Sequence, residues 1–255
     1  MHRPQVALYG LTGIPNVEPG DDVSKLILDA LARMGLTLQD GDVLVVTQKI
    51  TSKSEGRFVA LDTITPSPEA AQLAEETDKD PRLVDVILRE SKGLIRQGER
   101  TLIMETHHGW ICANAGVDRS NVDRPEEAKA LLLPVDPDAS ARHLREALLE
   151  ATGADIAVII SDTHGRPWRL GTVNIAIGLA GMYPVNDLRG HRDMFGYRLS
   201  VTEVARADEL AAAAGLISGQ ADEALPVVLI RGARYPHGDG RAVTMQRPAE
   251  KDLFR

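Results

Sequence analysis

The chain has 255 residues, enough for one large domain or two small ones with a sizeable buried core. Its 43% hydrophobic and 26% charged residues are typical of a soluble globular protein. The net charge of −8, without a basic block, argues against a nucleic-acid partner and against an anionic membrane surface. Cys112 is the single cysteine, which excludes an intrachain disulfide and favours a reducing, cytoplasmic location. The longest uncharged stretch, residues 171–186, is too short to span a membrane.

The N-terminal half is predicted to mix strands with amphipathic helices. Strands are expected over residues 6–9 and 42–47, and helices over 23–34, 67–77 and 81–92. The polar segment 48–57 is interpreted as a mobile loop. A hairpin is expected to join 101–104 to 110–113 through a turn at His107 and His108. Neighbouring hairpin residues point to opposite faces, so these two histidines are not expected to chelate a metal together.

The C-terminal half continues this mixture without a strict βαβ order. We expect a helix over 139–151 capped by Asp138, a buried strand over 156–160, a helix over 201–216 and a strand over 227–230. This pattern favours an α/β or mixed α+β class over a doubly wound sheet. The common P-loop, Rossmann, zinc-protease and serine-hydrolase motifs are missing from the sequence. With no long linker, residues 1–255 are interpreted as one unit.

Three polar segments follow strand-like runs and could carry chemistry. In segment 48–57, Lys49 and Lys53 flank hydroxyl side chains, a combination suited to phosphate oxygens. The alternative is a solvated loop in which the lysines provide solubility.

The second segment is ANAGVDRSNVD, residues 113–123. Gly116 would let the backbone approach a ligand closely, and the Asp118 carboxylate suits Mg²⁺ or Mn²⁺. The Asn121 amide could read a base or ribose edge. The alternative is an Asx turn, in which Asp and Asn bond their own backbone.

The third segment is IISDTHGRPWR, residues 159–169. Asp162 is expected directly after a buried strand, where a carboxylate beside the Thr163 hydroxyl could bind a cation. Arg166 and Arg169 could pair with phosphate or carboxylate oxygens. The alternatives are surface salt bridges for the two arginines and an ordinary loop position for His164.

Together these segments resemble the coenzyme F420-0:L-glutamate ligase family over nearly the whole chain. The matching strings are LTGIPNV, VTQKITSKSEGR, ANAGVDRSNV, LLLPVDPDASA, VIISDTHGRPWRLGTVNIAIG, RDMFGYRL and RPAEKDLFR. The resemblance implies an unusual α/β ligase fold, neither P-loop nor Rossmann, with two subdomains and an intertwined homodimer. Some relatives carry a further nitroreductase-like domain, for which a 255-residue chain has no room, so the stand-alone form is expected.

The resemblance also implies an activity and its residues. The activity is GTP-dependent addition of L-glutamate to coenzyme F420-0, with extension of a γ-linked oligoglutamate tail through acyl phosphates. Two Mg²⁺ or Mn²⁺ ions are implied, and K⁺ is a further candidate. The implied metal ligands are Asp118, Asp162, Thr163 and Gln220. The implied nucleotide site consists of Ile14, Pro15, Asn16, Val17, Gln48, Lys49, Lys53 and Asn121. Lys53 and Arg166 would offset charge during the reaction.

Two other functions stay open. A metal-dependent nucleotide phosphohydrolase would use the same Asp and Thr side chains to activate water. A non-enzymatic nucleotide-binding protein would bind GTP without turnover.

Overall fold

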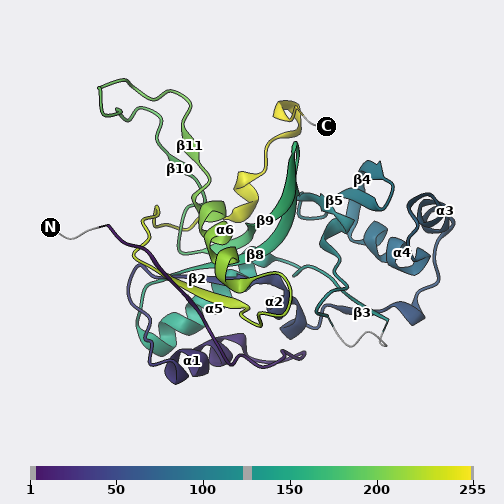
Figure 1. Ribbon diagram of the computed structural model, residues 1–255, viewed down its shortest axis with the longest axis horizontal. Helices are drawn as coiled ribbons and strands as arrows, with labels where there is room; N and C mark the ends of the chain where they lie inside the picture. The colour runs from purple at the N-terminus through teal and green to yellow at the C-terminus, as the bar shows by residue number, and fades with distance from the viewer. Residues whose placement is uncertain (1–3, 123–127, 254–255) are drawn as a thin grey trace.

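A five-stranded mixed sheet forms the centre of the computed structural model, which describes residues 4–122 and 128–253 (Figure 1). The order across the sheet is β1 (Ala7–Gly10), β12 (Val227–Arg231), β2 (Val43–Thr47), β8 (Ala157–Arg166) and β9 (Arg169–Ala180). Only β2 and β8 are parallel, and the other neighbours are antiparallel. The mixed α/β class expected from the sequence is therefore confirmed.

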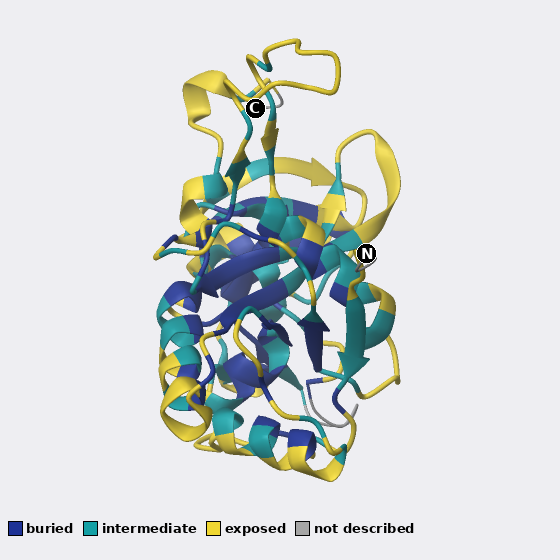
Figure 2. Cartoon of the chain, turned by 90° about the vertical axis from the view of Figure 1, so that its left-hand side faces the viewer, coloured by how far each residue is buried: buried dark blue, intermediate teal, exposed yellow. Residues whose placement is uncertain are grey.

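Helices cover the central sheet and bury its apolar strands (Figure 2). α5 (Pro137–Thr152) packs on β8 and β9, and α6 (Arg206–Ser218) packs on β9 and β12. α6 crosses the sheet on the viewer's side in Figure 1, and α1 (Val23–Arg33) packs beside α5. In the described residues, no helix is long and apolar enough to cross a bilayer.

The expected cap of α5 is wrong by two residues. Asp136 accepts the backbone N–H of Ala139 at 2.9 Å and caps the helix. Asp138 lies inside the first turn and is buried. Its Oδ1 accepts the backbone N–H groups of Leu179 at 3.0 Å and Ala242 at 2.8 Å. Both aspartates satisfy backbone donors, but Asp138 joins the helix to the sheet.

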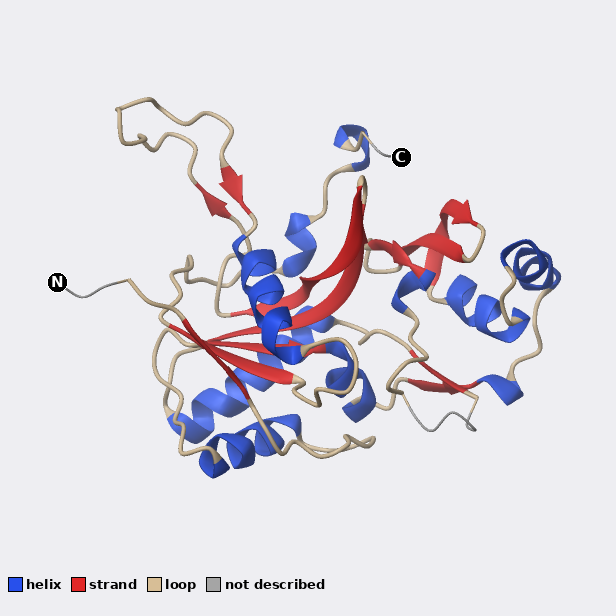
Figure 3. Cartoon of the chain, viewed as in Figure 1, coloured by secondary structure: helices blue, strands red, loops and turns tan. Residues whose placement is uncertain are grey.

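A second group of small elements lies between α2 and α5 in the chain and has its own apolar cluster, which includes Leu61, Ile87, Met104 and Val117. Its elements are β3 (Phe58–Ala60), α3 (Pro68–Thr77), α4 (Pro81–Arg89), β4 (Ser91–Gly98), β5 (Thr101–Thr106), β6 (Ile111–Ala113) and β7 (Lys129–Leu131). Figure 3 shows α3, α4 and the β4–β6 sheet beside the central sheet. The division into subdomains stays a prediction.

The expected hairpin between 101–104 and 110–113 is confirmed as β5 and β6. His107 Nε2 lies 2.8 Å from the Arg89 carbonyl oxygen, and His108 Nε2 lies 3.0 Å from that of Pro134. The two rings therefore contact different parts of the chain, as expected for a turn.

Three expectations about local structure are wrong. Segment 48–57 is not a mobile loop, because Gln48–Ser54 form the helix α2. β8 runs on to Arg166, so Asp162 lies within a hairpin and not at a strand end. The helix expected from residue 201 begins at Arg206, because the preceding residues form a projecting arm.

The arm is built on the two-residue strands β10 (Asn186–Asp187) and β11 (Glu203–Val204) and extends away from the body (Figure 1). Large apolar side chains are exposed at its tip. Met194 is 94% exposed and Phe195 is 93% exposed. Burial of apolar surface normally drives folding, so an exposed pair of this kind needs an explanation outside the fold of one chain.

Candidate functional site

A pocket of about 850 Å³ lies where the parallel strands β2 and β8 lead out of the central sheet. Thr47 pairs with Ser161 in this register, so both strands deliver their following residues to the same edge. Residues from segments 14–17, 47–53, 112–122, 161–165 and 218–226 line the pocket, together with Asn174. Five distant parts of the chain therefore meet there.

α2 forms one wall and connects it to the segment Ile14–Val17. The buried Lys53 donates from Nζ to Asn16 Oδ1 at 2.9 Å. Gln48 Oε1 accepts from Ser52 Oγ at 2.9 Å, one helical turn later. That bond orients the Gln48 amide so that its Nε2 donates to Asp118 Oδ2 at 2.7 Å. These contacts explain why a polar segment forms a helix whose side chains are largely buried.

Asp118 is held by backbone pairing and not by an Asx turn. Its N–H and C=O both bond to Leu131 at 2.9 Å. The carboxylate accepts from Gln48 and forms an ion pair with Lys49. Lys49 therefore neutralises part of the charge of a candidate metal ligand.

The chain just before Asp118 has an unusual backbone. Asn114 and Ala115 have φ values of 53° and 54°, and Gly116 has φ of 70°. A Cβ at Gly116 would lie 2.7 Å from Leu133 Cδ1, so this glycine is required for close packing as well as for its backbone angle. Consecutive left-handed residues are costly and persist where surrounding structure holds them, as at binding sites. On the other side of Asp118, Asn121 Nδ2 donates to the Ala221 carbonyl at 3.0 Å and joins two pocket walls.

Asp162 on β8 is the second carboxylate of the pocket. Its burial, and next the nearby charge of Asp118, raise its pKa to about 7. Burial lowers the pKa of His164 to about 4, so that imidazole is neutral, and its Nε2 lies 3.8 Å from Asp162 Oδ2. The two carboxylates therefore create negative charge that the neighbouring histidine does not offset.

Thr163 points to the opposite side of β8 from Asp162, as successive strand residues do. Its Oγ1 lies 2.9 Å from Gln220 Oε1. Gly219 ends α6 with φ 66° and ψ −165°, a conformation essentially limited to glycine, and a Cβ there would lie 1.9 Å from Glu223 Cδ. This turn brings Gln220 to Thr163.

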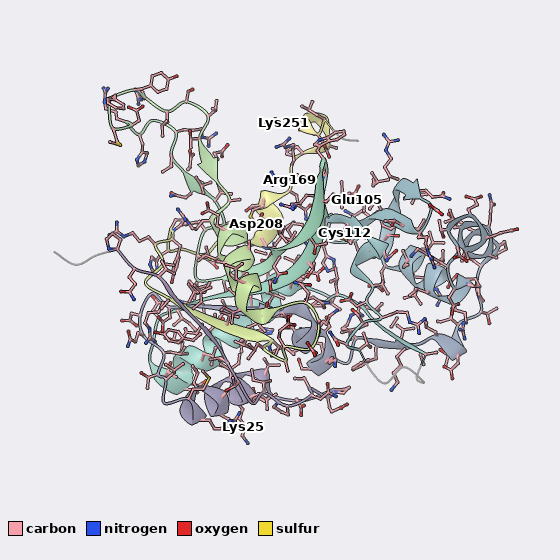
Figure 4. All side chains as sticks on the ribbon, in the orientation of Figure 1. Lys25, Glu105, Cys112, Arg169, Asp208 and Lys251 are labelled. Atoms are coloured by element: carbon pink, nitrogen blue, oxygen red, sulfur yellow. The ribbon has the colours of Figure 1, made fainter. Side chains whose placement is uncertain are left out.

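Every site residue that the family resemblance implies, except Arg166, lines this one pocket, and Arg169 also lies outside it. Arg166 lies near the tip of the β8–β9 hairpin, where its Nη2 donates to the Leu170 carbonyl at 3.0 Å. Figure 4 labels the neighbouring Arg169 close to that tip. A role for Arg166 would require a substrate that extends beyond Gly165, the nearest pocket residue in the chain.

Sequence reasoning missed several pocket residues, among them Cys112 and Asn174. Cys112 is labelled in Figure 4 beside the hairpin, and burial raises its pKa to about 12, so the thiol stays protonated and is a poor nucleophile. Asn174 on β9 is buried beside Thr163. The one feature of the sequence that could have indicated Asn174 is that a side-chain amide interrupts the mostly apolar run of β9.

The pocket residues fit a hard divalent cation that arrives with a phosphate ligand. Among the described residues, no group of three or more His, Cys, Asp or Glu side chains could hold a metal. Two carboxylates and the neutral oxygens of Thr163 and Gln220 are present instead. Mg²⁺ commonly takes one or two carboxylates and completes its shell with water and substrate phosphates. Since Asp162 and Thr163 face opposite sides of β8, they suit two neighbouring ions better than one.

Comparison with known proteins identifies the family of the chain. The family described as F420-0:Gamma-glutamyl ligase matches residues 12–232. The chain is 50% identical to the coenzyme F420:L-glutamate ligase of Methanothermobacter thermautotrophicus, over 98% of this chain and 99% of that protein. It is 46% identical to the same-named protein of Methanocaldococcus jannaschii, over 86% of each, and 38% identical to that of Archaeoglobus fulgidus, over 98% and 97%. The chain belongs to the F420-0:gamma-glutamyl ligase family.

Proposed function

We propose that this protein is a GTP-dependent ligase that joins L-glutamate to coenzyme F420-0 and then extends a γ-linked glutamate tail. The relatives' names support glutamate ligation to coenzyme F420. The observation that carries the proposal is the convergence of twelve predicted nucleotide and metal residues on one pocket. A volume of about 850 Å³ accommodates a nucleotide with part of a second substrate.

The reaction must activate a carboxylate, which is a poor acyl donor. A lactyl carboxylate oxygen of F420-0 attacks the γ-phosphorus of GTP, the bond to the β-phosphate oxygen breaks, and GDP leaves with the electron pair. The amine of glutamate then attacks the acyl carbon of the resulting acyl phosphate. A C–N bond forms, inorganic phosphate leaves, and the amine loses its proton to phosphate or water. In later cycles the γ-carboxylate of the last glutamate takes the place of the lactyl group.

The protein's own residues supply positioning and charge for these steps. Lys53, fixed by Asn16, offers a cation at the nucleotide wall. Arg166 would meet the part of F420-0 that extends along the hairpin. Asp118, Asp162, Thr163 and Gln220 would hold the divalent ions, which when bound neutralise phosphate charge. Such bound cations would reverse the negative charge near the carboxylates and favour the binding of a polyanion.

Incubation with F420-0, L-glutamate, GTP and Mg²⁺ or Mn²⁺ tests the proposal. Mass spectrometry should detect a ladder of products that differ by one glutamyl residue, with one GDP released for each step. GDP release without a ladder would instead support the nucleotide phosphohydrolase. A parallel reaction with ATP tests the choice of guanine, which rests on the resemblance alone.

We also propose that the protein acts as a homodimer whose arms contact the second copy. The exposed Met194 and Phe195 at the arm tip support this proposal, because one chain leaves them in water. Light scattering after size exclusion should give a dimer mass for the wild type. The double variant Met194→Ser, Phe195→Ser should shift toward monomer, while an exposed control such as Leu253→Ser should not. A monomeric wild type would contradict the proposal.

A further inference from the structure

Asn174 occupies the centre of a small hydrogen-bonded group on one wall of the pocket. It lies opposite Thr163 in the β8–β9 register and is 6% exposed. Its Oδ1 lies 3.2 Å from Thr163 Oγ1 and 2.8 Å from Gln220 Nε2. The three side chains come from a strand, its hairpin partner and the turn after α6, so this group joins three separate segments.

The hydroxyl of Thr163 has one proton but two acceptors within reach. Gln220 Oε1 lies at 2.9 Å and Asn174 Oδ1 at 3.2 Å. If the Thr163 hydroxyl donates its hydrogen bond to Gln220, the Gln220 amide oxygen is less available to a cation. If the hydroxyl donates to Asn174, the Gln220 oxygen and the lone pairs of the Thr163 oxygen are both available to a cation. Asn174 is therefore the acceptor that lets both oxygens act as ligands at the same time.

The contact with Gln220 determines which end of its amide faces the cation. Gln220 Nε2 donates to Asn174 at 2.8 Å, which turns the nitrogen toward β9 and leaves Oε1 on the side of Thr163. Without this bond the Gln220 amide could rotate and turn its N–H groups toward the cation. These N–H groups carry partial positive charge and would repel the cation. The same Asn174 oxygen thus orients both neutral oxygens.

We infer that Asn174 is the positioning residue of a cation subsite formed by Thr163 and Gln220. The inference rests on the proposed metal–GTP function and adds Asn174 to the residues that the family resemblance implies. Partners that orient ligands commonly change metal affinity by about 10–100-fold when they are removed. Asn174 would act through its neighbours and would not touch the cation itself.

Gly215 on α6 explains how Asn174 keeps its orientation. A Cβ at Gly215 would lie 3.1 Å from Asn174 Nδ2 and 3.3 Å from its Cγ. A glycine within a helix is disfavoured relative to alanine, so its presence here fits a need for close approach. The helix backbone therefore packs against the amide and limits its movement. A methyl group at position 215 would press on Asn174 without removing a polar group.

The test measures how Mn²⁺ promotes binding of a non-hydrolysable GTP analogue, so it does not depend on ligase activity. Asn174→Leu removes the acceptor at similar volume. We expect it to raise the Mn²⁺ concentration for half-maximal nucleotide binding about 10–100-fold. Asn174→Asp retains the acceptor and adds charge, so the required Mn²⁺ concentration should stay equal or fall.

Two further variants separate positioning from a purely structural role. Thr163→Val should show a similar shift, and the double variant Thr163→Val, Asn174→Leu should show little more, because both act on the same oxygen. Gly215→Ala should shift the Mn²⁺ requirement in the same direction, whereas the exposed Leu216→Ala on the same helix should not. If Asn174→Leu does not fold, Gly215→Ala carries the test.

Unchanged Mn²⁺ dependence in Asn174→Leu, or fully additive shifts in the double variant, would overturn the positioning role of Asn174. Neither result would contradict the proposed metal–GTP function. A wild-type protein that binds the GTP analogue equally well with and without Mn²⁺ would overturn the proposed metal–GTP function as well. The two failures are therefore distinguishable in one set of titrations.

Discussion

The two halves of the β8–β9 hairpin differ in their surroundings although they share one register. Residues 157–161 and 176–180 are buried between α5 and α6. Residues 162–166 and 169–174 are mostly exposed or half-buried, and four of them line the pocket. The register shifts between Ile160 and Ser161, where Ile177 is left as an extra residue on β9. This β-bulge lies where the buried half ends and the pocket half begins, and bulges commonly re-aim side chains beside functional sites.

The apolar half of the hairpin fixes the position of the polar half. Thr163 and Asn174 face each other because Val158 and Ala180 pair in the core of the same hairpin and the bulge at Ile177 then shifts the register by one residue. Substitutions in the buried half should therefore reduce stability, and substitutions in the pocket half should reduce activity with little effect on stability.

The largest effect is expected for Asp162→Asn. The change keeps the shape and removes the charge, so ligation should fall to about one hundredth or less of the wild-type rate. Stability at neutral pH should stay equal or rise, because burial disfavours the charged carboxylate. The product ladder and urea denaturation measure the two effects. Asp29→Asn, exposed on α1, is the matched control. Near-normal ligation by Asp162→Asn would remove this residue from the site.

Gly219→Ala should have the next largest effect on activity. Its backbone conformation is essentially restricted to glycine, and the new Cβ would overlap Glu223. The displaced turn moves Gln220 away from Thr163, and ligation should fall about tenfold to a hundredfold. Gly153→Ala is the control, because φ there is 73° but nothing lies within 4 Å of the new Cβ. It should reduce stability by about 1 kcal/mol without changing activity. Equal activity losses in both variants would contradict a specific role for the 219 turn.

Gly178→Ala and Gly165→Ala compare the two halves directly. A Cβ at Gly178 would lie 2.3 Å from the backbone of Pro137, so α5 or β9 must move. We expect a loss of about 1–3 kcal/mol in the free energy of unfolding. At Gly165 nothing lies within 4 Å of the new Cβ, and stability should change by less than about 0.5 kcal/mol. Similar losses in both variants would show that the halves are not energetically distinct.

Part of this fold could be predicted from the sequence because local signals agree with the tertiary structure. The apolar run of β2 and the starts of α3 and α4 are examples, and Ser67 and Asp80 each accept a backbone N–H at the start of a helix. α2 could not be predicted, because the burial of Gln48 and Lys53 depends on Asp118 and Asn16, which are distant in the chain. Tertiary contacts there outweigh a sequence rich in Ser and Thr.

For the site, too, contacts between residues distant in the chain could not be predicted from the sequence. Asp118 and Asp162 were candidates because carboxylates follow apolar runs, and both line the pocket, but the expected strand end at Asp162 is wrong. Asn174 could not be identified, because its importance lies in its pairing with Thr163 and not in its neighbours in the chain. Register across a hairpin with a bulge cannot be derived from a period-two pattern, since the extra residue reverses which side chains share a face.

The smallest expected effect concerns Asp208 on α6, labelled in Figure 4, which stabilises the boundary between the two halves. Its Oδ1 accepts the backbone N–H of Ala176 at 3.0 Å, next to the bulge. Burial raises the pKa of Asp208 above its ordinary value of 3.8. A raised carboxyl pKa favours folding at low pH, and this contribution is lost as the pH rises through the folded-state pKa.

Asp208→Asn keeps the acceptor but cannot ionise. Its stability should therefore match the wild type at pH values below the ordinary carboxyl pKa and become relatively higher as the pH rises toward neutrality. Urea denaturation at several values between about pH 3 and pH 7 measures the difference. Asp208→Ala should instead be less stable by about 1–3 kcal/mol throughout, because the Ala176 N–H loses its acceptor. The stability difference between Asp208→Asn and the wild type could instead stay the same at every pH. The charge of Asp208 would then oppose folding no more than the charge of an exposed carboxylate does. The bulge would then depend on the hydrogen bond alone.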